Sequence, residues 1–336
     1  MALRPVPWAT SGGIDGEGGA ENSVELARAD AFVGSSGATG IVDPTDFRVT
    51  ALPVPGAAVR VRMGTGVIRS TYATVFGQSY IVQEDSYTDV PVTATGSSGG
   101  ATKYVYVLIE DTQYSGQTPA DPANGPYNSY QVTTTLPTFQ PYLLLARIDQ
   151  PASTATIAQS MIVDLREVAN PREKKVVFPR PLVAGDDGLD LVSTSAYPDG
   201  EYFPNTGGNL NNGRYDINVP VWATRMQVRC EWIGIGFNNN PGAGLYWVTY
   251  GDGGGGTSPT YYTQAFGWNS TSGNYVTNWV LEQEVAVRPA WRGTTLPFFP
   301  RANFTTKNSG GSVHLSPRSG MVFSVRFMQQ ADQEDI

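Results

Sequence analysis

The sequence offers few side chains of the kind that perform covalent catalysis. It contains one cysteine, Cys230, and one histidine, His314. Residues 96–100 fit the G-x-S-x-G pattern of serine nucleophiles, but that pattern works on a strained turn between a strand and a helix, with a histidine base nearby. Here it falls in a Ser/Gly-rich turn between two expected strands. It therefore predicts a hairpin loop. Cys230 is expected as a small core residue, and His314 as a packed or interface residue.

Metal and phosphate sites are equally poorly supported. Asp186, Asp187 and Asp190 could offer oxygen ligands to calcium, but their spacing misses the EF-hand loop and its terminal glutamate. The GDGGGG segment at 251–256 fits G-x-G-x-x-G, yet Thr-Ser-Pro follows it where a phosphate site needs a helix. A lone cysteine leaves no Cys-based zinc site and no intrachain disulfide. We expect no cofactor and no metal.

Paired carboxylates are the remaining catalytic possibility. Glu231, Glu282 and Glu284 are candidates for glycoside hydrolysis by residue type, because the separation that this chemistry needs is a tertiary property. Each lies on a strand-like stretch with apolar neighbours, so a solvent-facing position is the simpler interpretation. The prediction is a protein that is not an enzyme, with a glycan hydrolase as the alternative.

Aromatic residues are distributed unevenly. Residues 178–336 hold six of the seven tryptophans. Aromatic rings can stack on sugar faces, fill a core or form a subunit interface. Four rings lie at or near the ends of polar loops expected at 238–244, 251–260 and 269–274. If those loops share one rim, the predicted receptor or glycan contacts are Trp247, Tyr250, Tyr261 and Trp268.

Composition indicates the fold class and excludes some partners. With 38 glycines, 24 prolines and 15% charged residues, against about 25% charged in average usage, the chain favours strands and turns over long helices. A net charge of −8 repels nucleic-acid phosphates and anionic membranes. No stretch approaches the ~18 apolar residues of a membrane helix, and the opening residues lack a signal peptide's apolar run. We expect an all-β protein made in a cytoplasm, with no nucleic acid and no membrane insertion.

Residues 1–45 are expected to form an N-terminal arm with one short helix. Asn22 and Glu25 fit a capping box, and Gly34 fits a C-terminal cap. A helix this short is marginal alone in water, so it must dock on the following domain or on other copies of the chain.

Three further segments follow. Residues 46–170 carry short strand patterns and predict a small β domain, with the apolar run 104–109 central in its sheet. The charged, proline-flanked segment 171–181 predicts an exposed linker. Residues 182–336 contain alternating polar and apolar stretches, clearest at 225–232, and predict an antiparallel β-sandwich of jelly-roll-like type.

Several phrases in the first half resemble the minor tail proteins of tailed bacteriophages that infect actinobacteria. They cover residues 1–175, and beyond Lys175 the resemblance is loose. The excess of eighteen arginines over four lysines agrees with a GC-rich host. The phrases are LRPVPWATSGG, ENSVELAR, TALPVPGAAVRV, DVPVTATGSSGGATKYVYVLIED, PANGPYNSY and QPASTATIAQSMIVDLREVANPREK.

The resemblance implies a virion protein at the tail tip, synthesised in the host cytoplasm and assembled as a homotrimer with other tail proteins. Residues 46–170 would attach to the tail, and residues 182–336 would bind host cell-wall glycan or another receptor. The family implies no catalytic residue. The alternatives are a tail-associated glycan hydrolase and a purely structural tail or capsid-decoration protein.

Overall fold

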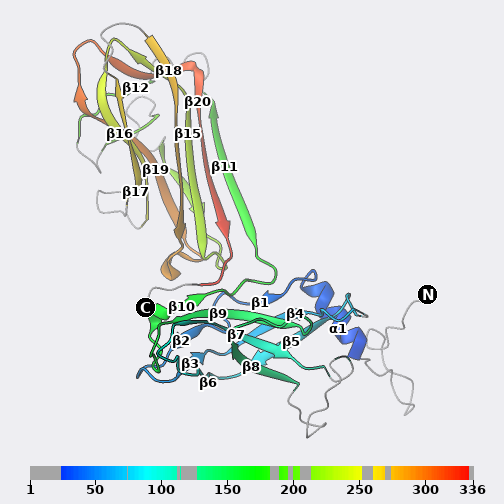
Figure 1. Cartoon of the computed structure of the whole chain (residues 1–336). Coiled ribbons are helices and arrows are strands. Elements are labelled where there is room, and N and C mark those ends of the chain that lie inside the picture. The colour runs from blue at the N-terminus through cyan, green and yellow to red at the C-terminus, as the bar shows by residue number, and fades with distance from the viewer. Residues whose placement is uncertain are drawn as a thin grey trace, which may run out of the picture. The chain divides into compact units, whose positions relative to one another are not determined.

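The computed structural model describes residues 24–73, 75–111, 114, 127–181, 189–195, 200–204, 213–251, 260–268 and 274–332. Their contacts divide the chain into two compact units (Figure 1). Unit 1 comprises Met1–Pro171 and Gln330–Ile336, and unit 2 comprises Arg172–Gln329. Both units are built mainly from antiparallel strands, so the all-β prediction is confirmed.

Unit 1 contains three small sheets around one apolar core. The first sheet has the order β1-β4-β5, the second β2-β3-β6 and the third β10-β9-β7-β8. As predicted, the apolar run at 104–109 lies in an interior strand, β7, between β9 and β8. The strands are β1 (Gly40–Ile41), β2 (Val49–Ala51), β3 (Ala58–Val61), β4 (Gly64–Arg69), β5 (Ser79–Glu84), β6 (Thr88–Pro91), β7 (Ala101–Ile109), β8 (Asn128–Thr133), β9 (Tyr142–Gln150) and β10 (Ile162–Asp164).

Helix α1 (Val24–Gly34) docks on β5 of the same unit. The Arg28 guanidinium lies 2.8 Å from the Asp111 carboxylate and 5.1 Å from the centre of the Tyr80 ring. The Tyr80 hydroxyl also donates a hydrogen bond to Asp111, at 2.9 Å. This polar cluster meets the docking requirement inferred from the length of the helix.

The end of α1 differs from the sequence expectation. The N–H of Gly37 donates to the Phe32 carbonyl at 2.8 Å, and Gly37 has a φ of +71°. A Cβ atom at this position would lie 2.7 Å from Cζ of Phe32. Gly37, and not Gly34, is therefore the left-handed capping glycine. The predicted N-cap, Asn22, lies outside the described residues.

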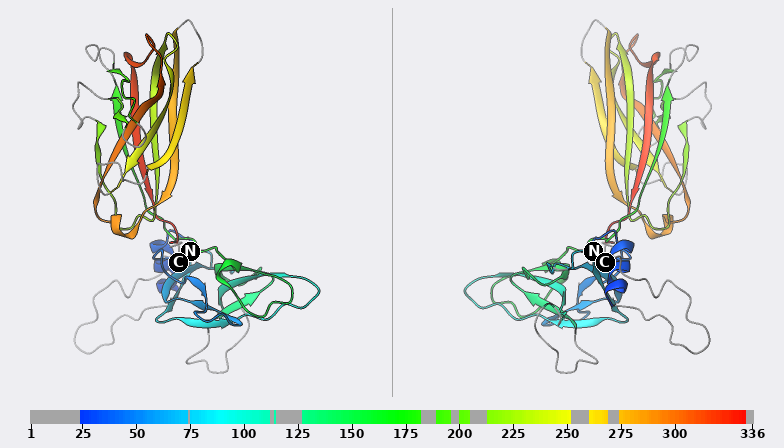
Figure 2. Two further views of the ribbon diagram at one scale, coloured as in Figure 1. Left: turned by 90° about the vertical axis from the view of Figure 1, so that its left-hand side faces the viewer. Right: turned by 90° about the vertical axis from the view of Figure 1, so that its right-hand side faces the viewer.

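Unit 2 is a jelly roll, as the sequence predicted. One sheet has the order β11-β20-β15-β18, and the other has the order β13-β19-β16-β17 with β14 also paired to β19. The pairs β11/β20, β14/β19, β15/β18 and β16/β17 are nested antiparallel pairs of one long hairpin that is rolled into a sandwich. Figure 2 shows its long strands from two sides. They are β11 (Glu173–Pro181), β12 (Leu189–Asp190), β13 (Glu201–Tyr202), β14 (Tyr215–Asn218), β15 (Arg225–Asn238), β16 (Gly242–Tyr250), β17 (Thr260–Trp268), β18 (Asn274–Ala286), β19 (Thr295–Lys307) and β20 (Ser312–Met328).

The predicted linker at 171–181 is wrong. Residues Glu173 to Pro181 form β11, which pairs continuously with β20 from Glu173↔Met328 to Pro181↔Gly320. β11 is an edge strand of its sheet. Edge strands tolerate prolines and charged residues, because one row of their backbone groups needs no partner in the sheet. The composition that suggested a linker is therefore that of a protected sheet edge.

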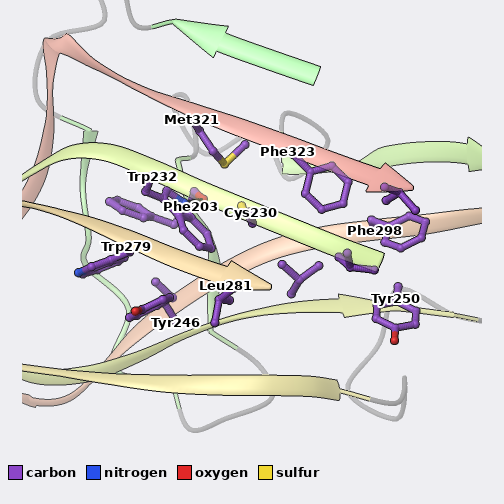
Figure 3. Close-up of a cluster of buried hydrophobic side chains, with 14 of the residues drawn as sticks. Phe203, Cys230, Trp232, Tyr246, Tyr250, Trp279, Leu281, Phe298, Met321 and Phe323 are labelled. Atoms are coloured by element: carbon purple, nitrogen blue, oxygen red, sulfur yellow. Dashed lines mark hydrogen bonds between the residues drawn. The ribbon is translucent and has the colours of Figure 1, made fainter. Parts of the chain in front are cut away.

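The core of unit 2 is rich in aromatic rings (Figure 3). The Tyr246 and Trp279 rings stack with centroids 4.6 Å apart, and the Trp232 indole N–H donates to the Phe203 carbonyl at 2.7 Å. Cys230 has no exposed surface, which confirms it as a small core residue. Burial raises the pKa of its thiol, so the group stays protonated.

The last described residues return to unit 1. The Arg166 side chain is fully buried, and its Nη2 donates to the carbonyl of Asp332 at 3.1 Å and to the Asp164 carboxylate at 2.7 Å. The Asp332 N–H donates to the Pro44 carbonyl at 2.9 Å. Unit 2 is thus inserted into unit 1 along the chain, and residues 330–332 do not belong to the sandwich as the predicted domain 182–336 implied.

Candidate functional site at the distal rim of the jelly roll

The strand register brings several chain connections together at one end of the sandwich. Asn238 of β15 pairs with Asn274 and Ser312, while Gly242 of β16 pairs with Trp268 and Lys307. We call this end the distal rim and define it by residues 238–242, 268, 274–275 and 305–314. It is opposite the end at which β11 begins and β20 finishes, where Glu173 pairs with Met328.

Only part of the predicted loop cluster lies there. The connections at 239–241 and 269–273 both start and finish at the distal rim. The connection at 251–259 does not, because its flanking pair Thr249↔Thr260 lies at the other end of β16 and β17. The three loops therefore do not share one rim, so the condition attached to the predicted contacts is not met. A different connection, 308–311, lies at the rim with the first two.

Asparagine side chains and backbone hold the described turns of the rim together. Asn239 and Asn240 both adopt left-handed conformations, with φ of 49° and 52°, which asparagine tolerates better than most residues. The Asn308 side-chain amide donates to Oδ1 of Asn240 at 3.1 Å, and the Asn308 N–H donates to the Pro241 carbonyl at 3.2 Å. Asn238 Nδ2 lies 3.4 Å from Nδ1 of His314. The rim is consequently a fixed polar surface.

One exposed aromatic ring accompanies these amides. Tyr275 follows Asn274 at the start of β18 and is 43% exposed, although it lies on the inward-facing side of the strand. Its ring centroid is 6.2 Å from that of Phe237. Asn239, Asn274 and Lys307 are also exposed. A flat ring beside amide donors and acceptors is the chemistry that binds a sugar ring and its hydroxyls.

Two of the four predicted contact residues are instead buried. Trp247 is 0% exposed and Tyr250 is 1% exposed. The Tyr250 ring stacks on Phe298 with centroids 5.2 Å apart, inside the sandwich. Trp247 lies on the other face of β16, where a Cβ atom at Gly200 would be 2.4 Å from Cη2 of its indole. Neither ring presents a free face to a ligand, so these two assignments are corrected.

The other two predicted residues lie on β17. The backbone of Trp268 is at the distal rim, paired with Gly242, whereas Tyr261 pairs with Val248 nearer the opposite end. Their side chains lie outside the described part of the chain. The structure thus separates Trp268 from Tyr261, and the contact role of each remains a prediction.

The candidate carboxylates at 231, 282 and 284 lie on the solvent-facing side of β15 and β18. Arg229 pairs with Glu231 at 3.1 Å and with Glu282 at 3.0 Å, and Arg225 pairs with Glu284 at 3.0 Å. All three are therefore held by arginines on an open sheet surface. This is the solvent-facing position that the sequence favoured.

A carboxyl that the sequence did not single out is chemically more unusual. Burial raises the pKa of Glu201 on β13, and the neighbouring Asp190 carboxylate raises it further. The backbone N–H of Val192 donates to Glu201 at 2.9 Å and works in the opposite direction. No sequence pattern marks Glu201, because its burial depends on strands far apart in the chain.

A second concave surface lies in unit 1. A cavity of about 360 Å³ is lined by apolar residues that include Leu144 and Leu165, with Arg69 and Glu167 as its charged groups. The Thr71 hydroxyl, also in the lining, donates to the carbonyl of Phe139 at 2.7 Å. With one charge of each sign, this cavity favours neither an anion nor a cation.

The described residues contain no group of three or more histidine, cysteine, aspartate or glutamate side chains placed to hold a metal ion. In the same part of the chain, no helix has the length and apolar character needed to cross a membrane.

Comparison with known proteins identifies no family. No family model matches the chain, and no curated protein matches it. Solved structures that align with it include the VP2 subviral particle of infectious bursal disease virus, at 12% identity over 88% of this chain and 68% of that one, with a TM-score of 0.23. The dimeric latent PorU of Porphyromonas gingivalis aligns at 10% identity over 87% of this chain and 24% of that one, with a TM-score of 0.27. Scores this low establish neither a shared fold nor a shared function, so the class assigned to unit 2, a jelly roll, rests on its own strand order.

Proposed function

We propose that the chain is a phage virion protein that binds a host cell-surface glycan through the distal rim of its jelly roll. The observation that carries the proposal is the placement of the exposed Tyr275 ring at the same rim as the hydrogen-bonded turns containing Asn240 and Asn308. Jelly rolls occur in viral capsid proteins and in lectins, which makes both halves of the proposal compatible with this fold.

The virion assignment has separate support. It rests on the resemblance of residues 1–175 to actinobacteriophage minor tail proteins. The assignment includes a location in the tail, attachment to the tail through unit 1, assembly as a homotrimer and contact with other tail proteins. The inserted topology suits such a role, since both ends of the jelly roll connect to unit 1 and leave the distal rim at the far end of unit 2.

Glycan binding at a shallow rim is weak for a single copy. Several copies on one particle would raise the avidity of weak sites by about 10²–10⁴ when they can engage together. A surface of one ring and several amides is therefore sufficient for attachment to a repetitive cell wall.

The experiment is binding of the purified chain to host cell-wall polysaccharide. Tyr275→Ala should weaken binding at least about tenfold, the loss of one stacking contact of about 1.4 kcal/mol. The matched control is Tyr127→Ala, because Tyr127 is 41% exposed and lies in unit 1. Equal binding by Tyr275→Ala and the parent would contradict the proposed site, and no binding by the parent would favour a purely structural role.

Hydrolysis is the second candidate, and Glu201 is the observation that favours it. A carboxyl with a raised pKa beside another carboxylate can act as a general acid. If the chain cleaves glycan, the parent should shorten cell-wall polysaccharide and Glu201→Gln should not. Binding without shortening leaves the adhesin proposal in place.

A further inference from the structure

We propose that the outward face of the β11-β20-β15-β18 sheet is a self-association surface that contacts a second copy of this chain. The inference deepens the oligomeric part of the proposed function, and it is independent of glycan binding at the distal rim. The two outer faces of the sandwich differ in how the chain covers them.

The outer face of the β19-β16 side is covered by the chain itself. Trp247, Arg301 and Asn303 point outward there, yet they are 0%, 8% and 1% exposed. Arg301 donates to the Gly200 carbonyl at 2.9 Å, and Asn303 donates to the Ser195 carbonyl at 2.7 Å. Residues from the connection before β14 therefore cover this face.

The outer face of the other sheet has no such cover among the described residues. Four large apolar side chains point outward from it, at 47%, 39%, 67% and 37% exposure, namely Val177, Ile233, Val276 and Val280. In the register, Val280 and Val322 are the two neighbours of Glu231, and Pro179 is the next residue across from Val322. Exposed apolar side chains within a polar surround are typical of a protein contact surface.

The charges on this face are compatible with a second copy of the chain as the partner. Where Gly320–Met328 of β20 pairs in register with its neighbours, four basic side chains (Lys175, Arg225, Arg229 and Arg326) balance four acidic ones (Glu173, Glu231, Glu282 and Glu284), and most of them are ion-paired within the sheet. The whole chain carries −8, so two copies repel one another over much of their surface. This part of the face is neutral, so it does not oppose contact between copies. Its neutrality also gives no attraction to a strongly basic or acidic partner.

The two edge strands of the sheet indicate on which side of the face the contact lies. β11 is protected by Lys174 and Lys175 and by its two prolines, as edge strands commonly are. β18 is also an edge strand of 13 residues, with the sequence NYVTNWVLEQEVA, and it has no lysine and no proline. Val276 and Val280 lie on β18 and Ile233 lies on its neighbour β15, so the proposed contact is centred on this side of the face.

The test measures self-association of the full chain by sedimentation equilibrium over a range of concentrations. The parent should form species larger than its 36.1 kDa monomer mass. Ile233→Asp and Val280→Asp should each weaken association at least about tenfold, because a charge is placed in an apolar contact. The control is Val221→Asp, since Val221 is 71% exposed in the same unit and is not on this sheet.

A cysteine variant keeps the test decisive if an aspartate variant misfolds. Val280→Cys should react with a maleimide more slowly at protein concentrations where copies associate than at dilution, whereas Val221→Cys should react equally at both, and the buried Cys230 should not interfere. A parent that stays at 36.1 kDa overturns the proposal. Association of the parent with unchanged affinity in both aspartate variants overturns it as well. Loss of glycan binding in Tyr275→Ala with association intact would leave this inference standing.

Discussion

At the scale of single residues, exposure decides which aromatic side chains are available to a ligand. Trp247 is 0% exposed and packs against Gly200, so its replacement removes buried contacts. Trp247→Ala should lower the free energy of unfolding of unit 2 by about 3–5 kcal/mol, as large-to-small core substitutions do. Denaturant unfolding measures this loss, with Val221→Ala as a surface control that should change stability by less than about 0.5 kcal/mol.

A different result would reassign Trp247. If Trp247→Ala kept the stability of the parent but lost glycan binding, the indole would be a ligand contact, contrary to its burial. Sequence alone could not separate Trp247 from Tyr275, because both lie beside polar turns. Their difference arises from what covers each strand: Gly200 lies over Trp247, while Tyr275 lies at the open end of the sandwich.

Glu201 gives a prediction about pH. Burial raises the pKa of its carboxyl in the folded chain above the ordinary value, so the folded state keeps a proton that the unfolded state has already lost. The stability of the parent relative to Glu201→Gln should therefore fall as pH rises from about 4 to 7, and the variant should be the more stable protein at neutral pH.

Thermal unfolding of unit 2 at both ends of this range provides the measurement. Glutamine keeps an oxygen that can accept the hydrogen bond from the Val192 N–H, so the comparison isolates the charge. A stability difference that does not change with pH would show that Glu201 titrates alike in the folded and unfolded states.

At the scale of elements, local patterns predicted strands well and their partners poorly. The alternation at 225–232 is part of β15, and the apolar run at 104–109 is part of the interior strand β7. The pairing of β11 with β20 joins residues about 150 positions apart, as in Glu173↔Met328. No local signal encodes that pairing, and a charged edge strand with prolines therefore resembled a linker.

The role of β11 can be tested with two fragments. A fragment of residues 172–329 contains every strand of the jelly roll and should unfold cooperatively. A fragment of residues 182–329 lacks β11, whose Val176 and Phe178 pack against the core. Its free energy of unfolding should fall by at most roughly 1.5–3 kcal/mol for each of these side chains. The loss should be smaller than this maximum because both side chains are only partly buried. Equal stability of the two fragments would mean that β11 is dispensable.

At the scale of the whole molecule, the jelly roll is an insertion within unit 1. The sequence predicted a boundary near residue 171, where the first connection lies. It did not predict that residues 330–332 return to unit 1, because the return depends on a tertiary contact. Arg166 makes that contact: it donates to the Asp332 carbonyl at 3.1 Å and to the Asp46 carbonyl at 2.6 Å.

The insertion makes the C-terminal segment a structural part of unit 1. Arg166→Ala in the full chain should destabilise unit 1 by about 2–4 kcal/mol, because it leaves buried carbonyls and the Asp164 carboxylate without their donor. The unfolding transition of unit 2 should not move, since none of these groups belongs to it. The control is Arg147→Ala, which breaks an exposed pair with Asp149 and should cost less than about 1 kcal/mol.

A chain that stops at Gln329 tests the same contact from the other side. It should lose part of the stability that Arg166→Ala loses, because Asp332 supplies both a carbonyl to Arg166 and an N–H to the Pro44 carbonyl. Two-transition calorimetry can assign the loss to unit 1. If the shortened chain unfolds like the parent, the return of the chain into unit 1 contributes no stability, and Arg166 acts only through Asp164 and the carbonyls of Pro44 and Asp46.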